Sequence, residues 1–215
     1  MKKQFITLGT LSIALILAGF GCSKATTPIS STATNNNTQP DAVANSNNKV
    51  EQPLPLITDN TTKGSFLTYT NDTGISIGYP SDWSQQEGKK PILVQFFSPL
   101  QSTTDKFQES VSLMVQDFST VTITLEQFDK QTTSALAQYM TDLKITKQEN
   151  IEINGKPGKM LTYTGTMPGQ NALSSTFQAY TVSNNIVYLI TYTGKQDDFE
   201  KFLPTVQKML KTIVF

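Results

Sequence analysis

Ile186-Val187-Tyr188-Leu189-Ile190-Thr191-Tyr192 is the stretch of sequence that decides the fold. Successive side chains of a β-strand point to opposite faces of the sheet, so an extended chain divides this stretch into two sets. One set is Ile186, Tyr188, Ile190 and Tyr192, and the other is Val187, Leu189 and Thr191. Both sets are largely apolar. We therefore expect a strand covered on both faces, with one layer above the sheet and another below it.

Turn residues around this stretch indicate antiparallel strands. Asn184-Asn185 and Asn154-Gly155 each separate two apparent strands by two residues that tolerate positive φ, and Asn71-Asp72-Thr73-Gly74 forms a third turn signal. Strands joined so tightly must run antiparallel. The expected strands are 66–70, 75–79, 92–97, 111–118, 145–153, 159–166, 174–182 and 186–193. In strand 111–118, Val111, Leu113 and Val115 alternate with Ser112 and Gln116, which predicts a half-exposed position.

Two stretches are expected to be helical. Thr124-Leu125-Glu126-Gln127 matches a capping box, and an apolar stripe with three- and four-residue spacing follows it. The second helix is expected at 197–211, where Pro204 should break or kink it. The first stripe consists of Leu125, Phe128, Thr132, Leu136, Tyr139, Met140 and Leu143. Together, these patterns predict an α+β fold, with an antiparallel β-sheet flanked by helices in an α-β-α sandwich.

The N-terminus resembles a bacterial lipoprotein signal. Lys2 and Lys3 precede a mostly apolar run, which Gly21 and the single cysteine Cys22 follow. We expect cleavage before Cys22 and a lipid anchor on it, placing the protein on the extracytoplasmic face of the cell membrane. The lipobox match is partial, so an uncleaved anchor and ordinary secretion with cleavage after Ala25 remain alternatives. The expected domains are signal 1–21, a disordered Ser/Thr/Asn-rich tether 22–63, and a folded domain 64–215.

Composition excludes several function classes. The chain contains no Arg and no His, so it lacks the bidentate fork that recognises phosphate and the side chain best suited to proton transfer. We therefore expect no nucleic-acid partner, no cofactor and no enzymatic activity. A Ser-Lys dyad or paired carboxylates would be needed for an enzyme, and no local motif indicates either.

Acidic side chains are the weak candidates for a metal site. Asp105 and Glu109 lie in an expected polar loop, whereas Asp197, Asp198 and Glu200 precede the second helix. Either group offers oxygen ligands for Ca²⁺, but neither follows the spacing of a calcium loop. Compensation of the helix dipole explains the second group without a metal. We therefore expect structural roles for both.

Trp83 and two loops complete the candidate set. Trp83, the only tryptophan, is expected in the core because a buried Trp contributes a large apolar surface, although an exposed recognition anchor is the alternative. The loops 101–109 and 167–171 are expected to be exposed and to carry recognition rather than packing.

Five segments of the chain resemble the PsbP-like family, from about residue 66 to the C-terminus. They are Gly74-Ile75-Ser76-Ile77-Gly78-Tyr79-Pro80-Ser81-Asp82-Trp83, Val94-Gln95-Phe96-Phe97-Ser98-Pro99, Glu109-Ser110-Val111-Ser112-Leu113-Met114-Val115, Ile153-Asn154-Gly155-Lys156-Pro157-Gly158 and Val187-Tyr188-Leu189-Ile190-Thr191-Tyr192-Thr193. The resemblance implies an α-β-α sandwich. It also implies an extrinsic role at photosystem II if the host is photosynthetic, although many bacterial relatives are lipoproteins without a photosystem. This chain has no His to match the metal-site histidines of the family.

The sequence therefore predicts a non-catalytic, lipid-anchored domain that binds or stabilises a membrane or envelope protein complex. A small-ligand or calcium-binding lipoprotein receptor is the alternative, and a deep polar pocket would favour it.

Overall fold

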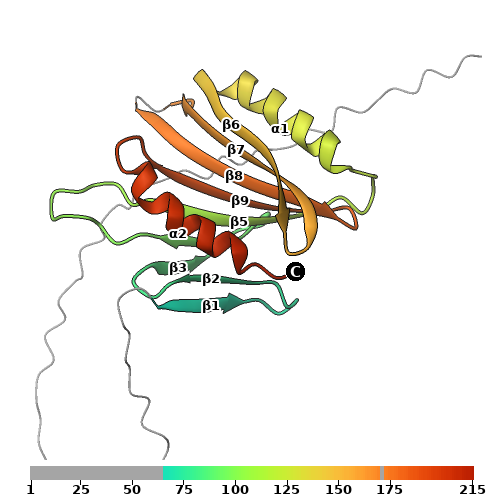
Figure 1. Cartoon of the computed structure of the whole chain (residues 1–215), viewed down its shortest axis with the longest axis horizontal. Coiled ribbons are helices and arrows are strands. Elements are labelled where there is room, and N and C mark those ends of the chain that lie inside the picture. Colours follow the sequence, from blue (N-terminus) through green and yellow to red (C-terminus); the bar gives the residue numbers. More distant parts are fainter. Residues whose placement is uncertain (1–64, 170–171) are drawn as a thin grey trace, which may run out of the picture.

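The computed structural model describes residues 65–169 and 172–215. These residues form a seven-stranded antiparallel sheet of order β3-β4-β5-β9-β8-β7-β6, a two-stranded antiparallel ribbon β1-β2, and two helices (Figure 1). The α+β sandwich expected from the sequence is therefore confirmed. The elements are β1 Phe66–Thr70, β2 Ser76–Pro80, β3 Ser84–Glu87, β4 Ile92–Phe97, β5 Ser110–Asp117, α1 Leu125–Tyr139, β6 Thr141–Ile153, β7 Lys156–Thr166, β8 Leu173–Ser183, β9 Ile186–Lys195 and α2 Phe199–Lys211.

β9 is covered on both faces, as its sequence predicts. Ile190 and Tyr192 belong to one apolar cluster, which also contains Val206 and Met209 of α2. On the opposite face, Val187 and Leu189 belong to a second cluster with Phe128 and Leu136 of α1. Alternate residues of one strand thus feed two separate cores, one under each helix.

The β1-β2 ribbon lies on the same face of the sheet as α2. Its Ile77 and Tyr69 join the α2 cluster. The backbone N–H of Gly78 donates to Thr212 Oγ1 at 2.7 Å, and a Cβ at Gly78 would lie 3.0 Å from that oxygen. Ser76 and Val214 also form an antiparallel β-bridge. The ribbon is therefore fixed to the end of the chain as well as to the sheet.

The two predicted hairpins are confirmed. Asn154 and Gly155 join β6 to β7 with φ values of 48° and 70°. Asn184 and Asn185 join β8 to β9 with φ values of 52° and 59°. Positive φ at both central residues is the geometry of a type I′ turn, which matches the twist of the flanking strands.

The first helix begins as predicted and ends earlier. Thr124 and Gln127 form the capping box, with each side chain accepting from the other residue's backbone N–H. The helix ends at Tyr139, because Met140 is extended and the chain continues directly into β6. Tyr139 is 56% exposed, so its assignment to the apolar stripe is wrong. Leu143 lies in β6 rather than in the helix.

Two further local expectations need correction, and one strand was not expected. Pro204 lies inside α2 without ending it, since packing of Phe199, Val206 and Met209 holds the helix across the missing hydrogen bond. Strand β5 is not half-exposed over most of its length, because both Leu113 and its neighbour Met114 are buried. The short polar strand β3 pairs with β4 and carries no apolar alternation that could have predicted it.

Trp83 lies in the core, as expected. Its side chain is 6% exposed and its ring meets the Phe202 ring of α2 edge-on, with centroids 5.9 Å apart. The indole therefore packs the chain after β2 against α2 and is no exposed anchor.

Candidate functional site

A loop of residues 98–109 joins β4 to β5 and projects from one end of the sheet (Figure 1). Asp105 organises this loop from within. Its carboxylate accepts backbone N–H groups on both sides along the chain, from Gln101 at 3.1 Å and from Phe107 at 3.1 Å. The Asp105 N–H in turn donates to Ser102 Oγ at 3.1 Å. These short-range bonds fold the loop around one carboxylate.

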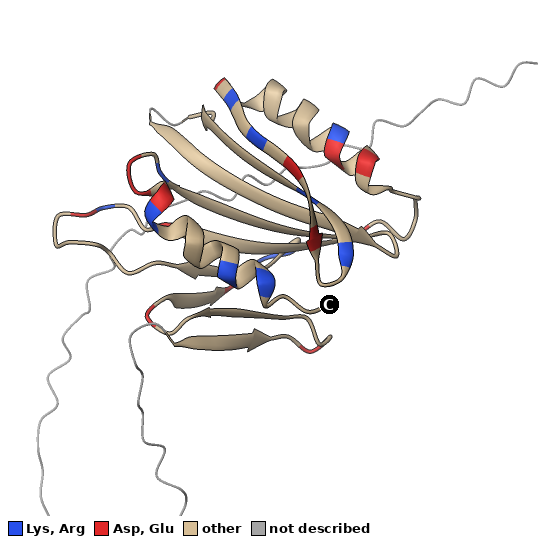
Figure 2. Ribbon diagram, in the orientation of Figure 1, with Lys and Arg blue, Asp and Glu red and all other residues tan. Residues whose placement is uncertain are grey.

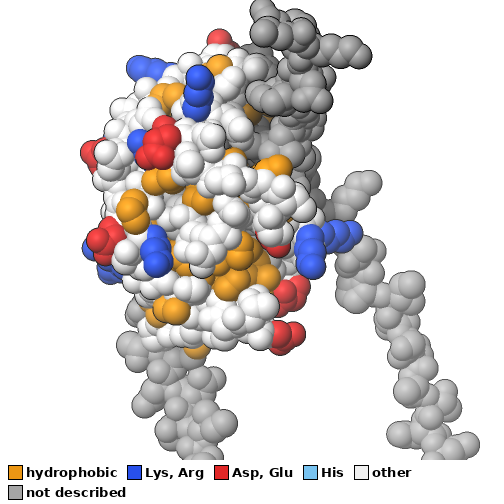
Figure 3. All heavy atoms as spheres, turned by 90° about the vertical axis from the view of Figure 1, so that its right-hand side faces the viewer, with side chains coloured by type: hydrophobic (Ala, Val, Ile, Leu, Met, Phe, Trp, Pro, Cys, Tyr) orange, Lys and Arg blue, Asp and Glu red, His pale blue; other side chains and the backbone are white. Residues whose placement is uncertain are grey.

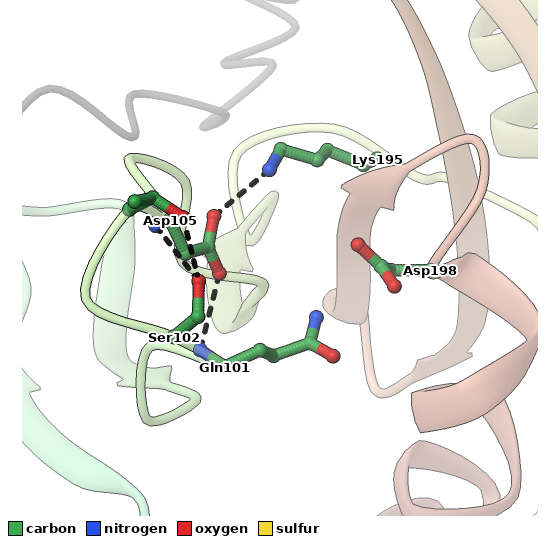
Figure 4. A pocket seen from close by; sticks show the side chains of 6 residues that line it. Gln101, Ser102, Asp105, Lys195 and Asp198 are labelled. Carbon is green, nitrogen blue, oxygen red and sulfur yellow. Dashed lines mark hydrogen bonds and ion pairs between the residues drawn. The ribbon is translucent and has the colours of Figure 1, made fainter.

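Two lysines bond to this loop, one at the end of β9 and one in the first turn of α2. Lys195 Nζ lies 2.8 Å from Asp105 Oδ1 (Figure 4). Lys201 Nζ donates to Gln101 Oε1. The hydrogen bond from Lys195, followed by those from the two backbone N–H groups, lowers the pKa of Asp105 well below its usual range. The Asp105 side chain is only 7% exposed, and its oxygens bond to Lys195 and to the backbone N–H groups of Gln101 and Phe107.

Loop 98–109, the end of β9 and the N-cap residue of α2 border an open polar pocket of about 350 Å³. Asp105 and Asp198, which the sequence offered from two distant segments, both line it, and in Figure 4 the Asp198 carboxylate faces the side occupied by Gln101 and Asp105. Asp198 is the N-cap residue of α2 but makes no capping bond with its side chain. The lining residues are Gln101, Ser102, Thr104, Asp105, Lys195 and Asp198.

The other acidic candidates lie elsewhere. Glu109 is 1% exposed at the base of the loop, where its Oε2 accepts from Ser98 Oγ at 3.0 Å and its N–H donates to the same hydroxyl at 3.1 Å. The expectation that Glu109 belongs to an exposed loop is therefore wrong, because its carboxylate and its backbone N–H both bond to the hydroxyl of buried Ser98. Asp197 is exposed and does not line the pocket.

This arrangement does not resemble a calcium site. Within 65–169 and 172–215, no three His, Cys, Asp or Glu side chains gather closely enough to hold a metal ion. Calcium takes six to eight oxygen ligands, whereas the carboxylate of Asp105 already binds the ammonium of Lys195. The pocket is polar, but its groups largely bond to one another.

Sequence reasoning missed the lysines. Asp105 and Asp198 were considered as metal ligands or helix-dipole partners, and Lys195, two residues before Asp197, was not considered. Its position at the end of the central strand β9 was the available signal. In Figure 2, basic and acidic residues are interspersed over the ribbon without a single-sign face.

Several expected features lie outside the described residues. They include the signal 1–21, the tether 22–63, the lipidation site Cys22, and Gln170 and Asn171 of the second loop. Among the helices that are described, none has the length and apolar character needed to cross a membrane.

A family model described as PsbP-like protein matches residues 30–213. The chain belongs to the PsbP-like family. The match covers the whole described domain up to Ile213 and part of the segment before it. Comparison with curated proteins found no match.

Solved structures share the PsbP-like fold at low sequence identity. Cyanobacterial PsbP (CyanoP) from Synechocystis sp. PCC 6803 is 13% identical with a TM-score of 0.52, over 72% of this chain and 95% of that chain. PA94, a protein of unknown function from Pseudomonas aeruginosa, is 17% identical with a TM-score of 0.51, over 71% of this chain and 98% of that chain. At such identities the similarity concerns the fold alone.

Proposed function

We propose that this PsbP-like domain is a non-catalytic binding module, anchored to the extracytoplasmic face of a membrane through a lipid on Cys22. Loop 98–109 contacts a protein partner there. The partner belongs to a membrane or envelope complex, which is photosystem II if the host is photosynthetic. The observation that carries this proposal is the internal order of the loop around Asp105.

An ordered loop loses little conformational freedom when a partner binds it. Loop 98–109 projects from the sheet, and its order comes from its own hydrogen bonds and from Lys195 and Lys201. It nevertheless leaves Leu100 51% exposed. An apolar side chain held in the open on a pre-organised loop is a suitable anchor for a protein contact.

The chemistry of the pocket favours binding over catalysis. Lys195 is bonded to a carboxylate, which raises the pKa of its ammonium group, so it is poorly suited to act as a base. Asp105, with its lowered pKa, is equally poor as a general acid near neutrality. Neither half of this pair supplies a group poised for proton transfer. The pocket does not favour the calcium-receptor alternative either, because the charge of Asp105 is already balanced by Lys195.

Site-specific photo-cross-linking in the native membrane tests the proposal. A photoreactive residue in place of Leu100 should yield a defined protein adduct, identified by mass spectrometry. The matched control is Val121, which is 40% exposed and lies between β5 and α1. Adducts of equal yield from both positions would show that loop 98–109 is not the contact surface.

The anchor is tested on the same samples. Cys22→Ala should move the protein from the membrane fraction to the soluble or secreted fraction and abolish the Leu100 adduct. Recovery of the unaltered chain with an unmodified N-terminus at Thr26 would instead indicate ordinary secretion after Ala25.

A further inference from the structure

Strand β6 forms a long edge of the seven-stranded sheet. It stands last in the strand order, pairs only with β7 among the described strands, and runs for 13 residues from Thr141 to Ile153. Every residue from Lys144 to Asn150 is exposed. An edge strand presents backbone N–H and C=O groups that can pair with another strand. The opposite edge, β3, is only four residues long.

Helix α1 lies over the middle of the sheet rather than over its β6 edge. Its Phe128 and Leu136 share an apolar cluster with Val187 and Leu189 of β9, which is three strands away from β6. The outer side of β6 therefore remains open to a second strand.

The charged residues of β6 are ordered along the strand. Lys144 and Lys147 come before Gln148, and Glu149 and Glu152 come after it. Two such strands running antiparallel bring the basic half of each against the acidic half of the other, whereas parallel strands would bring like charges together. Figure 3 faces the right-hand side of the molecule as drawn in Figure 1 and shows basic and acidic side chains in small mixed groups. The order of charges along β6 is therefore a more specific signal for self-association than the surface charge seen on that face.

Irregularities at the start of β6 limit which strands can be added to it. The pairing with β7 shifts between Thr141 and Lys144 and again between Ile145 and Lys147, and Asp142, inside the first shift, has a φ of 54°. Bulges and charged side chains protect an edge against unselective strand addition. The regular part of the ladder begins at Lys147, so a specific contact should be centred close to that residue.

Lys147 and Glu149 select one register for a second copy. They are two residues apart and so lie on the same face of β6, where Lys147 Nζ is 3.2 Å from Glu149 Oε2 and both side chains are about half exposed. With Gln148 on a two-fold axis, Lys147 of each copy lies directly opposite Glu149 of the other, and the two ion pairs form one cluster of alternating charges. Moving the axis by one residue, to Lys147 or to Glu149, would place like charges opposite each other, which is unfavourable.

We propose that the domain forms a two-fold symmetric dimer in which β6 pairs antiparallel with β6 of a second copy, with Gln148 on the axis. The sheets of the two copies then form one continuous sheet. Both copies use the same surface, so the association closes at a dimer and does not propagate. Three strands, β9, β8 and β7, separate β6 from β5, where loop 98–109 ends, so the dimer does not depend on the protein contact proposed above.

Disulfide cross-linking of the full chain in its native membrane tests this register. Gln148→Cys should give a dimer linked through position 148, because directly opposite Cα atoms of antiparallel strands lie about 4.5–5.5 Å apart, which a disulfide can span. The matched control is Asn150→Cys, which is also exposed and lies on the same face but would be about 13 Å from its symmetry mate. Mass spectrometry of the linked peptides distinguishes these links from any bond through Cys22. Equal yields at the two positions, or linkage of position 148 to another protein instead of a second copy, would overturn the proposal.

Charge variants that also carry Gln148→Cys test the pairing of Lys147 with Glu149. Lys147→Glu alone and Glu149→Lys alone should each lower the yield of linked dimer about tenfold, because like charges then lie opposite each other twice in every dimer. When the two variants are co-expressed with different tags, they should link to each other at close to the yield of the Gln148→Cys chain. Both positions are exposed, so the denaturant midpoints should stay near that of the parent and show that the variants are folded. An unchanged yield in both folded single variants, or a failure of the two variants to link to each other, would overturn the assigned contact.

Discussion

The two ends of the central strands β5 and β9 differ in the polarity of the residues around them. At the end that carries loop 98–109, Asp105 binds Lys195 and two backbone N–H groups, so the surface is ordered and its polar atoms are largely paired. At the opposite end, an apolar cleft of about 600 Å³ lies between the β1-β2 turn, the start of β4, the end of β5 and the start of β9, and Ile92, Val115 and Ile186 on its wall are partly exposed. One end therefore presents mostly paired polar groups, whereas the other presents partly exposed apolar side chains.

This difference suggests a division of labour between the two ends. A surface whose hydrogen bonds are already made can gain affinity from its shape and its exposed apolar side chains, which suits a protein partner. A partly exposed apolar cleft gains affinity by burying apolar surface, which suits a small ligand. The sheet between them acts as a scaffold for both.

The largest expected effect comes from a substitution in the core of the scaffold, which should lower the stability of the whole domain and affect the two ends only in that way. Trp83→Ala should destabilise the protein by about 3–5 kcal/mol, because it opens a cavity against Phe202. Denaturant midpoints measure this loss. The matched aromatic control is Tyr139→Ala, which removes a side chain that is 56% exposed and should cost little.

The same variants test whether stability and binding separate. Per folded molecule, the Leu100 cross-link yield of Trp83→Ala should equal that of the parent. A stable Trp83→Ala protein that fails to form the adduct would show that the indole is part of the contact surface. That result would contradict the assignment of the contact to loop 98–109.

A smaller effect should come from the base of the loop. Ser98→Ala should cost about 1–3 kcal/mol, because Glu109 Oε2 loses its 3.0 Å hydrogen bond from Ser98 and Oε1 has no partner among the described residues. Thermal or denaturant unfolding measures it. Ser119→Ala, at an exposed position, is the control and should stay within about 0.5 kcal/mol of the parent. Equal midpoints for the two variants would show that the polar end is not held by this buried pair.

Local patterns predicted the parts of the fold that local physics decides. The alternation in Ile186–Tyr192 predicted two covered faces, and Asn154-Gly155 and Asn184-Asn185 predicted tight turns, because each signal lies within a few residues. The end of α1 was not predictable in this way. Leu143 continues a helical stripe equally well, and only the pairing of β6 with β7 makes it a strand residue.

The candidate site was predicted only in part, for the same reason. Asp105 and Asp198 were identified as candidates from the sequence, but the pocket that both of them line was not predicted. That pocket depends on how close loop 98–109 lies to the start of α2 in the folded protein. The burial of Glu109 depends on Ser98, at the other end of the loop. The bulge at Leu93, a residue that lines the apolar cleft, has no Gly or other sequence signal in β4 that could have predicted it.

The smallest expected effect is the pH dependence of loop order, which concerns the Asp105–Lys195 pair alone. The pKa of Asp105 is lowered, so its stabilising contribution is fully present above the ordinary aspartate pKa of about 3.9 and is lost as the pH falls through the lower, folded-state value. The pKa of Lys195 is raised, so its contribution is present below the ordinary value of about 10.4 and is lost as the pH rises through the folded-state value. The loop should therefore stay ordered from about pH 4 to pH 10.

The backbone N–H resonances of Gln101 and Phe107, which donate to Asp105, report the loss of loop order at low pH in NMR titrations. The backbone N–H resonance of Gly74, which donates to the Asn71 carbonyl, is the control. Lys195→Met keeps most of the side-chain stem and removes the charge, so the acid midpoint of both reporter resonances should move upward toward the ordinary aspartate range. An acid midpoint that stays the same in Lys195→Met would mean that the backbone N–H groups alone hold the carboxylate, and that the loop is ordered without its attachment to the end of β9.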